Sequence, residues 1–218
     1  MKTIAEVIKL SASYLEERKI DPPRRIAEEL LSHVLQLKRI DLYLQFDRPV
    51  VEVELTRLRE WVKRAGKGEP LEYVTGEVEF FGCTIKIDQR VLIPRPETEI
   101  LVEMISKRVK NGVLWDLCTG SGCIGIALKR ALPELSVTLS DLSPDALALA
   151  AENAKGLEIE ILQGDLLEPF RGRKADFVVC NPPYISQREF FTLDPAVRDF
   201  EPIMALVAGE RELSFTSV

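Results

Sequence analysis

The chain has 218 residues, 46% of them hydrophobic and 29% charged, which suits one medium domain or a small domain joined to a larger one. A net charge of −6 and a pI near 5.1 argue against a protein that works mainly by binding nucleic acid, because such proteins normally carry a basic face. No apolar run approaches the roughly 20 residues that span a bilayer, and the first residues lack a signal-peptide core, so we expect a cytoplasmic protein with no membrane partner.

The first part of the chain is predicted to be helical throughout. Apolar residues recur at helical spacing from Ile4 to Leu15, and Asp21-Pro22 supplies a cap followed by a proline, which is typical of a helix start. Helices are expected near residues 4–15, 22–37, 39–46 and 53–65. We therefore assign residues 1–68 to a small helical domain.

A β-hairpin is predicted to follow. Tyr73-Val74-Thr75 and Val78 to Phe81 flank Gly76-Glu77, and a further strand is expected from Thr84 to Ile87. Pro94 to Glu99 then breaks the strands and begins a helix that reaches about Lys110. Residues 69–92 are accordingly assigned to a hairpin linker and residues 93–218 to a second domain.

Strands and helices alternate in this second domain. Strands are expected at residues 113–117, 136–140, 158–163 and 176–180, with helices at about 123–131 and 144–155. Alternation at this spacing predicts parallel strands with crossover helices, which is an α/β fold of the Rossmann-like kind.

A glycine-rich loop follows the first of these strands. Its sequence, Cys118-Thr119-Gly120-Ser121-Gly122, extends to Gly125 and matches the dinucleotide fingerprint G-x-G-x-x-G, with Asp141 about 20 residues further on. A nicotinamide-dependent dehydrogenase is therefore one interpretation. In that interpretation the Asp141 carboxylate accepts hydrogen bonds from the ribose hydroxyls of NAD. It would serve the ribose of S-adenosylmethionine equally well.

Three features favour S-adenosylmethionine over NAD. Asp116, at the end of the first strand, suits a cationic amino-acid ligand better than a pyrophosphate. Gly164-Asp165 closes the third strand with an acceptor for an adenine amine. The fourth strand ends in a turn at Asn181 that a dehydrogenase does not need. We therefore expect S-adenosylmethionine, with the dehydrogenase kept as an alternative.

That turn is Asn181-Pro182-Pro183-Tyr184, and proline cannot continue a sheet. Asn and Pro are common turn formers, so an ordinary exit from a strand is one explanation. The other is that the Asn181 side-chain oxygen and the Pro182 carbonyl accept from one planar NH2 group, with the Tyr184 ring over it. Fixing a weakly nucleophilic nitrogen in this way suits methylation of an amide or an exocyclic amine.

The sequence offers little for a metal site or a hydrolytic triad. The single histidine, His33, lies in the helical part, and the four cysteines form no C-x-x-C pair. We expect reduced thiols and no metal.

Together these segments resemble the bacterial peptide-chain release factor N5-glutamine methyltransferases. The Asn-Pro-Pro-Tyr turn alone is shared with adenine-N6 methylases of DNA, but its combination with Pro94 to Glu99 and a helical front end is specific. The resemblance rests on Gly68 to Tyr73, Gly76, Glu79-Phe80, Pro94 to Glu99, Asp116 to Gly125, Asp141, Asp165 and Asn181 to Tyr184.

The resemblance implies methyl transfer from S-adenosylmethionine to the glutamine of the Gly-Gly-Gln motif in release factors. This is a protein methylation, and the methylated proteins act in translation termination. It implies in-line transfer without a covalent intermediate, release factors docked by the helices before residue 66, and no direct nucleic-acid binding. The cofactor would be held by Cys118, Thr119, Gly120, Ser121, Gly122, Asp141, Asp165, Leu166 and Asn181. The target amide would be held by Asn181, Pro182, Pro183 and Tyr184, with Asn181, Pro182 and Tyr184 catalytic.

The end of the chain departs from the family. Glu201-Pro202 and Ala205-Leu206 are present, but Val207 to Leu213 keeps one glycine and lacks the usual Asp-Gly, and the strands that usually follow are absent before Val218. We therefore expect an incomplete sheet, an exposed edge on strand 176–180 and reduced stability. Two other functions stay open: an adenine-N6 nucleic-acid methyltransferase, and a truncated inactive module that binds cofactor or release factor without turnover.

Overall fold

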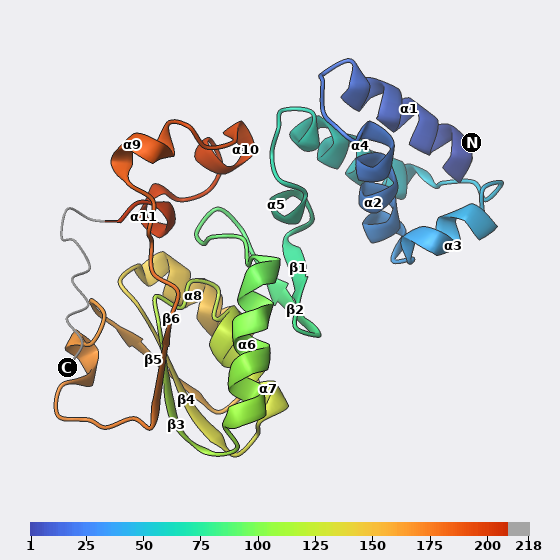
Figure 1. Cartoon of the computed structure of the whole chain (residues 1–218). Helices are drawn as coiled ribbons and strands as arrows, with labels where there is room; N and C mark the ends of the chain where they lie inside the picture. Colours follow the sequence, from blue (N-terminus) through green and yellow to red (C-terminus); the bar gives the residue numbers. More distant parts are fainter. Residues whose placement is uncertain (209–218) are drawn as a thin grey trace. The chain divides into compact units, whose positions relative to one another are not determined.

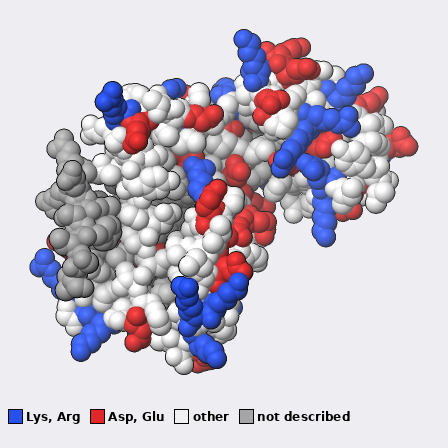
Figure 2. Space-filling view, in the orientation of Figure 1, with Lys and Arg blue, Asp and Glu red and all other residues white. Residues whose placement is uncertain are grey.

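The computed structural model describes residues 1–208, and they divide into two compact units (Figure 1). The first unit is Met1–Thr75 and the second begins at Gly76, each with a hydrophobic core of its own. Among residues 1–208, no helix is long and apolar enough to cross a membrane. On the face drawn in Figure 2, Lys and Arg side chains are interspersed with Asp and Glu.

The first unit is helical, and the four expected helices are confirmed. Thr3 begins the first helix with a capping box, in which the Glu6 carboxylate accepts from the Thr3 N–H at 2.8 Å. The second helix begins with a proline, but that proline is Pro23; its N-cap is Pro22 and no side chain caps it, so the expected cap at Asp21 is wrong. The helices are α1 (Ile4–Glu16), α2 (Pro23–Leu35), α3 (Arg39–Leu44), α4 (Glu52–Ala65) and a short α5 (Leu71–Thr75).

The strand expected at Tyr73-Val74-Thr75 is wrong, because these residues end helix α5. The Arg64 guanidinium donates to the Tyr73 carbonyl at 2.8 Å and to the Val74 carbonyl at 3.2 Å. These bonds satisfy carbonyls that a helix end leaves free. Val74 and Thr75 are β-branched and therefore typical of strands, but the contact with Arg64 favours a helix at these positions.

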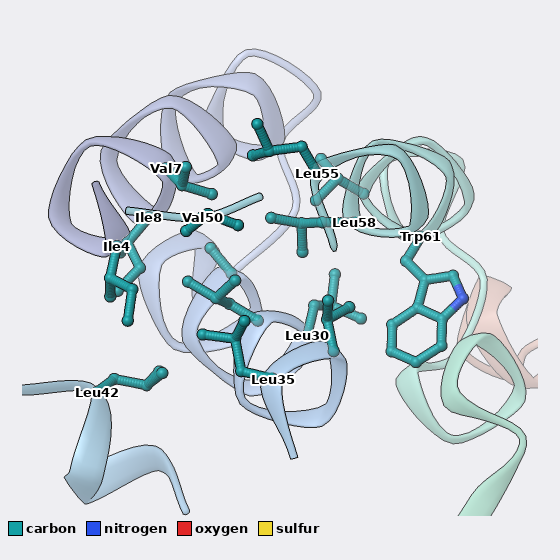
Figure 3. Close-up of a cluster of buried hydrophobic side chains, with 14 of the residues drawn as sticks. Ile4, Val7, Ile8, Leu30, Leu35, Leu42, Val50, Leu55, Leu58 and Trp61 are labelled. Carbon is teal, nitrogen blue, oxygen red and sulfur yellow. The ribbon is translucent and has the colours of Figure 1, made fainter. Parts of the chain in front are cut away.

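The core of this unit gathers the apolar stripes of α1, α2 and α4 (Figure 3). Ile4, Ile8 and Leu30 are among the side chains that point toward one another from different helices, and Leu42 of α3 is also buried there. Burial of these stripes supplies the stability that helices of this length lack in isolation.

The second unit begins with the expected hairpin. Strands β1 (Glu77–Phe80) and β2 (Cys83–Lys86) pair antiparallel, and helix α6 (Pro96–Arg108) follows. The Asn153 side chain binds both the N–H and the carbonyl of Lys86 at 2.9 Å, and it also donates to the Ser121 carbonyl at 2.9 Å. Asn153 therefore joins the hairpin to the glycine-rich loop.

The predicted α/β alternation is confirmed. All pairings in the sheet are parallel, and the strand order is β5-β4-β3-β6. The strands are β3 (Gly112–Leu117), β4 (Leu135–Asp141), β5 (Ile159–Gln163) and β6 (Phe177–Cys180); the helical elements are α7 (Cys123–Ala131), α8 (Pro144–Asn153), η1 (Glu168–Phe170), α9 (Gln187–Phe190), α10 (Pro195–Arg198) and α11 (Ile203–Leu206).

The two faces of β3 have different partners. Trp115 stacks on Phe170 of η1 with ring centroids 4.1 Å apart, whereas the next residue, Asp116, bonds the N–H of Gly125 in α7. In the part of the sheet that the structure describes, β6 is the edge strand next to β3, and the Val178 side chain is 54% exposed. The expected departure from the family at residues 209–213 lies outside the described residues.

Gly125 is where α7 approaches the sheet most closely. A Cβ built on it would lie 2.3 Å from Leu139 Cδ2. We expect Gly125→Ala to lower the free energy of unfolding by about 1–3 kcal/mol in urea unfolding, despite the better helix propensity of alanine. In a Leu139→Ala background the loss should largely disappear, and an equal loss in both backgrounds would refute this steric explanation.

Candidate functional site

A cavity of about 890 Å³ lies at the carboxyl ends of the sheet strands. Residues directly after β3, β5 and β6 line it, together with Asp141 at the end of β4, as expected for an open parallel sheet. The predicted site residues in its wall are Cys118, Thr119, Gly120, Ser121, Asp141, Asp165, Leu166, Asn181, Pro182 and Pro183. The structure does not bring Gly122 or Tyr184 into this wall.

The glycine-rich loop turns tightly as it leaves β3. Gly120 has a φ of +54°, and a Cβ built on it would meet no atom within 4 Å, so its backbone borders open space. Gly122 has a φ of +81°, and its Cβ would lie 2.8 Å from Ile126 Cδ1. Gly122 therefore serves the packing of α7, which explains its position outside the wall.

Asp141 supports this loop from the neighbouring strand. Its Oδ2 accepts from the Gly120 N–H at 2.8 Å, and its Oδ1 accepts from the Ser143 N–H at 3.0 Å. Its backbone carbonyl accepts from the Gly164 N–H at 3.0 Å. Each carboxylate oxygen keeps a free lone pair for a ligand hydroxyl.

Asp116 does not lie in the cavity wall, so its expected contact with a cationic ligand is wrong. The residue is fully buried, and its Oδ2 accepts from Thr119 Oγ1 at 2.6 Å and from the Gly125 N–H at 2.9 Å. Within the described residues, Oδ1 has no hydrogen-bond partner. Burial raises the pKa of Asp116 to about 7, against the opposing effect of these two hydrogen bonds. Asp116 thus positions Thr119 of the glycine-rich loop and Gly125 of α7 without reaching the cavity.

The Asn181 turn lies beside the glycine-rich loop. Leu117 pairs with Cys180, so the chain leaves β3 and β6 at the same level of the sheet, and Cys118 and Asn181 come next in each strand. A hydrogen bond with the Cys180 thiol, followed by burial, raises the pKa of Cys118, which favours the neutral thiol. Tyr184 is 78% exposed outside the cavity.

The wall fits S-adenosylmethionine. Asp141 and Asp165 supply carboxylates for hydroxyl and amine groups, and the wall next to them carries the apolar side chains of Leu142 and Leu166. Ile124, at the amino end of α7, also lines the cavity, where the helix end favours a ligand carboxylate. A parallel sheet with this loop and this donor set defines a Rossmann-like, S-adenosylmethionine-dependent methyltransferase.

Comparisons with known proteins agree with this class. Residues 96–195 match the methyltransferase small domain, and residues 6–76 match the PrmC N-terminal domain. The release factor glutamine methyltransferase of Geobacter sulfurreducens is 39% identical over 216 residues, covering 98% of this chain and 76% of that protein. Its counterpart from Chlorobaculum tepidum is 40% identical over 223 residues, covering 94% and 76%. The chain belongs to the release factor glutamine methyltransferase family.

Two segments of the cavity wall were not predicted from the sequence. Neither follows a strand of the parallel sheet: the first, before α6, contributes Arg90, Val91, Leu92 and Pro94, and the second, in and around α11, contributes Pro202, Met204, Ala205, Val207 and Ala208. Asn153 was missed as well, although it binds the loop through the Ser121 carbonyl. The Glu201-Pro202 pair, recognised as a family feature, was the available signal for the second segment.

Removing the Asp141 carboxylate should weaken cofactor binding. Asp141→Ala leaves the N–H groups of Gly120 and Ser143 without their acceptor and removes the acceptor for ligand hydroxyls. We expect the Kd for S-adenosylmethionine to rise at least about tenfold in calorimetric titration. The exposed Asp145→Asn variant is the matched control and should bind like the wild type. If Asp141→Ala bound S-adenosylmethionine as tightly as the wild type, Asp141 would not be a cofactor-binding residue.

Proposed function

We propose that this protein transfers the methyl group of S-adenosylmethionine to the side-chain amide nitrogen (N5) of the glutamine in the Gly-Gly-Gln motif of peptide chain release factors. The observation that carries the proposal is the Asn181-Pro182-Pro183 turn in the same cavity wall as the glycine-rich loop and Asp141. The family membership of the chain supports the choice of a glutamine as the methyl acceptor.

The cofactor supplies an electrophilic methyl group, and the protein positions the amide nitrogen that accepts it. A glutamine amide is a weak nucleophile, because its nitrogen lone pair is delocalised into the carbonyl. The Asn181 side-chain oxygen and the Pro182 carbonyl each accept one N–H of that amide, which orients the nitrogen toward the loop at Cys118 to Ser121. Such positioning contributes up to roughly 7–11 kcal/mol to lowering a barrier. Tyr184 is 78% exposed outside this wall, so its proposed contact with the amide requires its ring to move when the substrate binds.

The division of labour along the chain follows from this proposal. Residues 1–68 dock the release factor and residues 93–218 carry the methyl transfer, while the segment expected as a hairpin linker, residues 69–92, contains helix α5 as well as the β1–β2 hairpin. The match to the PrmC N-terminal domain over residues 6–76 supports the first assignment. A cytoplasmic location suits a protein that acts on release factors, and the four free cysteines support it.

A labelling experiment tests the proposal. The chain is incubated with S-adenosylmethionine carrying a labelled methyl group and with a release factor, and the labelled residue is located by mass spectrometry. We expect label on the Gly-Gly-Gln glutamine and none on a release factor in which that glutamine is replaced by alanine. Label elsewhere on the release factor would refute the assigned acceptor.

The same experiment separates the other candidates. Label on an adenine-containing duplex would show an adenine-N6 methyltransferase instead. Cofactor binding with no label on either substrate would show a module that binds without turnover. Tight binding of NAD with no affinity for S-adenosylmethionine would favour the alternative interpretation, a nicotinamide-dependent dehydrogenase.

A further inference from the structure

Glu201 directly precedes the cavity-lining residue Pro202, and its buried carboxylate has partners that lie far away in the sequence. Its side chain is 1% exposed, and it accepts from Arg95 Nη2 at 2.5 Å and from the backbone N–H of Ile93 at 3.2 Å. The pair joins this buried carboxylate to a guanidinium that is 36% exposed, and such a pair is weak evidence for stability, because desolvation offsets much of the attraction. Its location therefore needs another explanation.

The two partners belong to two segments of the chain that both contribute to the wall. Arg95 directly precedes α6 and itself lines the cavity, whereas Glu201 directly precedes Pro202 and α11, where Met204 and Ala205 line the cavity. The ion pair thus fixes the separation between these two segments of the wall.

The α11 side of the pair continues to the Asn181 turn. The Ile185 N–H donates to the Leu206 carbonyl at 3.0 Å, and the Ala208 N–H donates to the Ile185 carbonyl at 2.9 Å. Ile185 follows Tyr184 directly, so these bonds hold the far end of the turn. A continuous series of contacts runs from Arg95 through Glu201 and α11 to Ile185.

We propose that Glu201 and Arg95 are positioning residues for methyl transfer, which hold α11 so that the Asn181 turn faces the glycine-rich loop at a fixed distance. This inference rests on the proposed function for the reaction that it positions. The cofactor side of the cavity is held independently, through the bond from the Gly120 N–H to Asp141. Loss of the ion pair should therefore affect transfer more than cofactor binding.

The first test separates turnover from binding. Glu201→Gln keeps the shape of the side chain and removes its charge. We expect kcat with a release factor to fall at least about tenfold while the Kd for S-adenosylmethionine stays within about threefold. Arg95→Lys keeps the charge and should retain about a third or more of the wild-type kcat. Asp199→Asn, in the exposed pair with Arg198, is the matched control and should behave like the wild type.

The second test needs no turnover. Hydrogen exchange at the Ile185 and Ala208 amides should accelerate at least about tenfold in Glu201→Gln but not in Asp199→Asn, because both amides donate to the bonds that hold the turn. Wild-type kcat in Glu201→Gln, or a loss of cofactor binding equal to the loss of kcat, would overturn the proposal. Unchanged exchange would overturn it too. A wild-type chain inactive on release factors would refute the proposed function alone, and the exchange result would still decide the role of the pair.

Discussion

Replacing Asn181 with alanine is expected to lower kcat for glutamine methylation by roughly 100-fold or more, a much larger effect than on the Kd for S-adenosylmethionine. The side-chain oxygen of Asn181 is one of the two acceptors that orient the target amide, and alanine cannot replace it. Backbone bonds hold the turn itself, since the Ile185 N–H donates to the Leu206 carbonyl. The variant should therefore fold normally and fail in the transfer step, as single-turnover and binding measurements would show.

The matched control for this variant is Asn111→Ala. Asn111 is an exposed asparagine before β3, outside the cavity wall, and its loss should leave kcat unchanged. If Asn181→Ala kept a kcat within a few-fold of the wild type, the turn would be an ordinary exit from β6, which is the simpler explanation of an Asn-Pro sequence.

The second large effect concerns stability and pH. Burial raises the pKa of Asp116 from 3.8 to about 7, so the folded state holds a proton over a pH range in which the unfolded state has released it. This contribution to stability is fully present in acid and is lost as the pH rises through about 7. A pKa difference of this size corresponds to roughly 4 kcal/mol.

Asp116→Asn should remove this dependence. Its amide oxygen still accepts from Thr119 and Gly125, and the amide carries no charge at any of these pH values. The free energy of unfolding is measured in urea at several pH values from about 4 to about 8. We expect the difference between the variant and the wild type to shift in favour of the variant as the pH rises, by up to roughly 4 kcal/mol. A constant difference between the two proteins across that range would show that Asp116 is ionised in the folded state throughout.

The position of the site was predictable from the sequence for a topological reason. Parallel strands place their carboxyl ends at one edge of the sheet, so recognising the strands before Cys118, Gly164 and Asn181 was enough to bring these residues together. The exact helix and strand ends differ from expectation by a few residues, but the residues that follow the strands keep their place.

What the sequence could not supply depends on long-range contacts and on side-chain direction. Strand alternation places Trp115 and Asp116 on opposite faces, yet both faces of a parallel sheet are buried, so the pattern does not say which residue reaches a ligand. The pairing of Arg95 with Glu201 joins residues 106 positions apart and has no local signature. The helix at Leu71–Thr75 likewise depends on Arg64, in another helix.

The register of β3 against β6 has a consequence for how the enzyme tolerates change. Because Leu117 pairs with Cys180, the loop and the turn start side by side on neighbouring strands, which lie about 4.8 Å apart. Main-chain bonding therefore fixes where the loop and the turn begin, whereas contacts beyond the strands, such as the Arg95–Glu201 pair, act on the rest of the turn. Hydrophobic substitutions in the core leave these two starting points paired, whereas a one-residue insertion in either strand would shift one of them by about 3.3 Å and end the alignment.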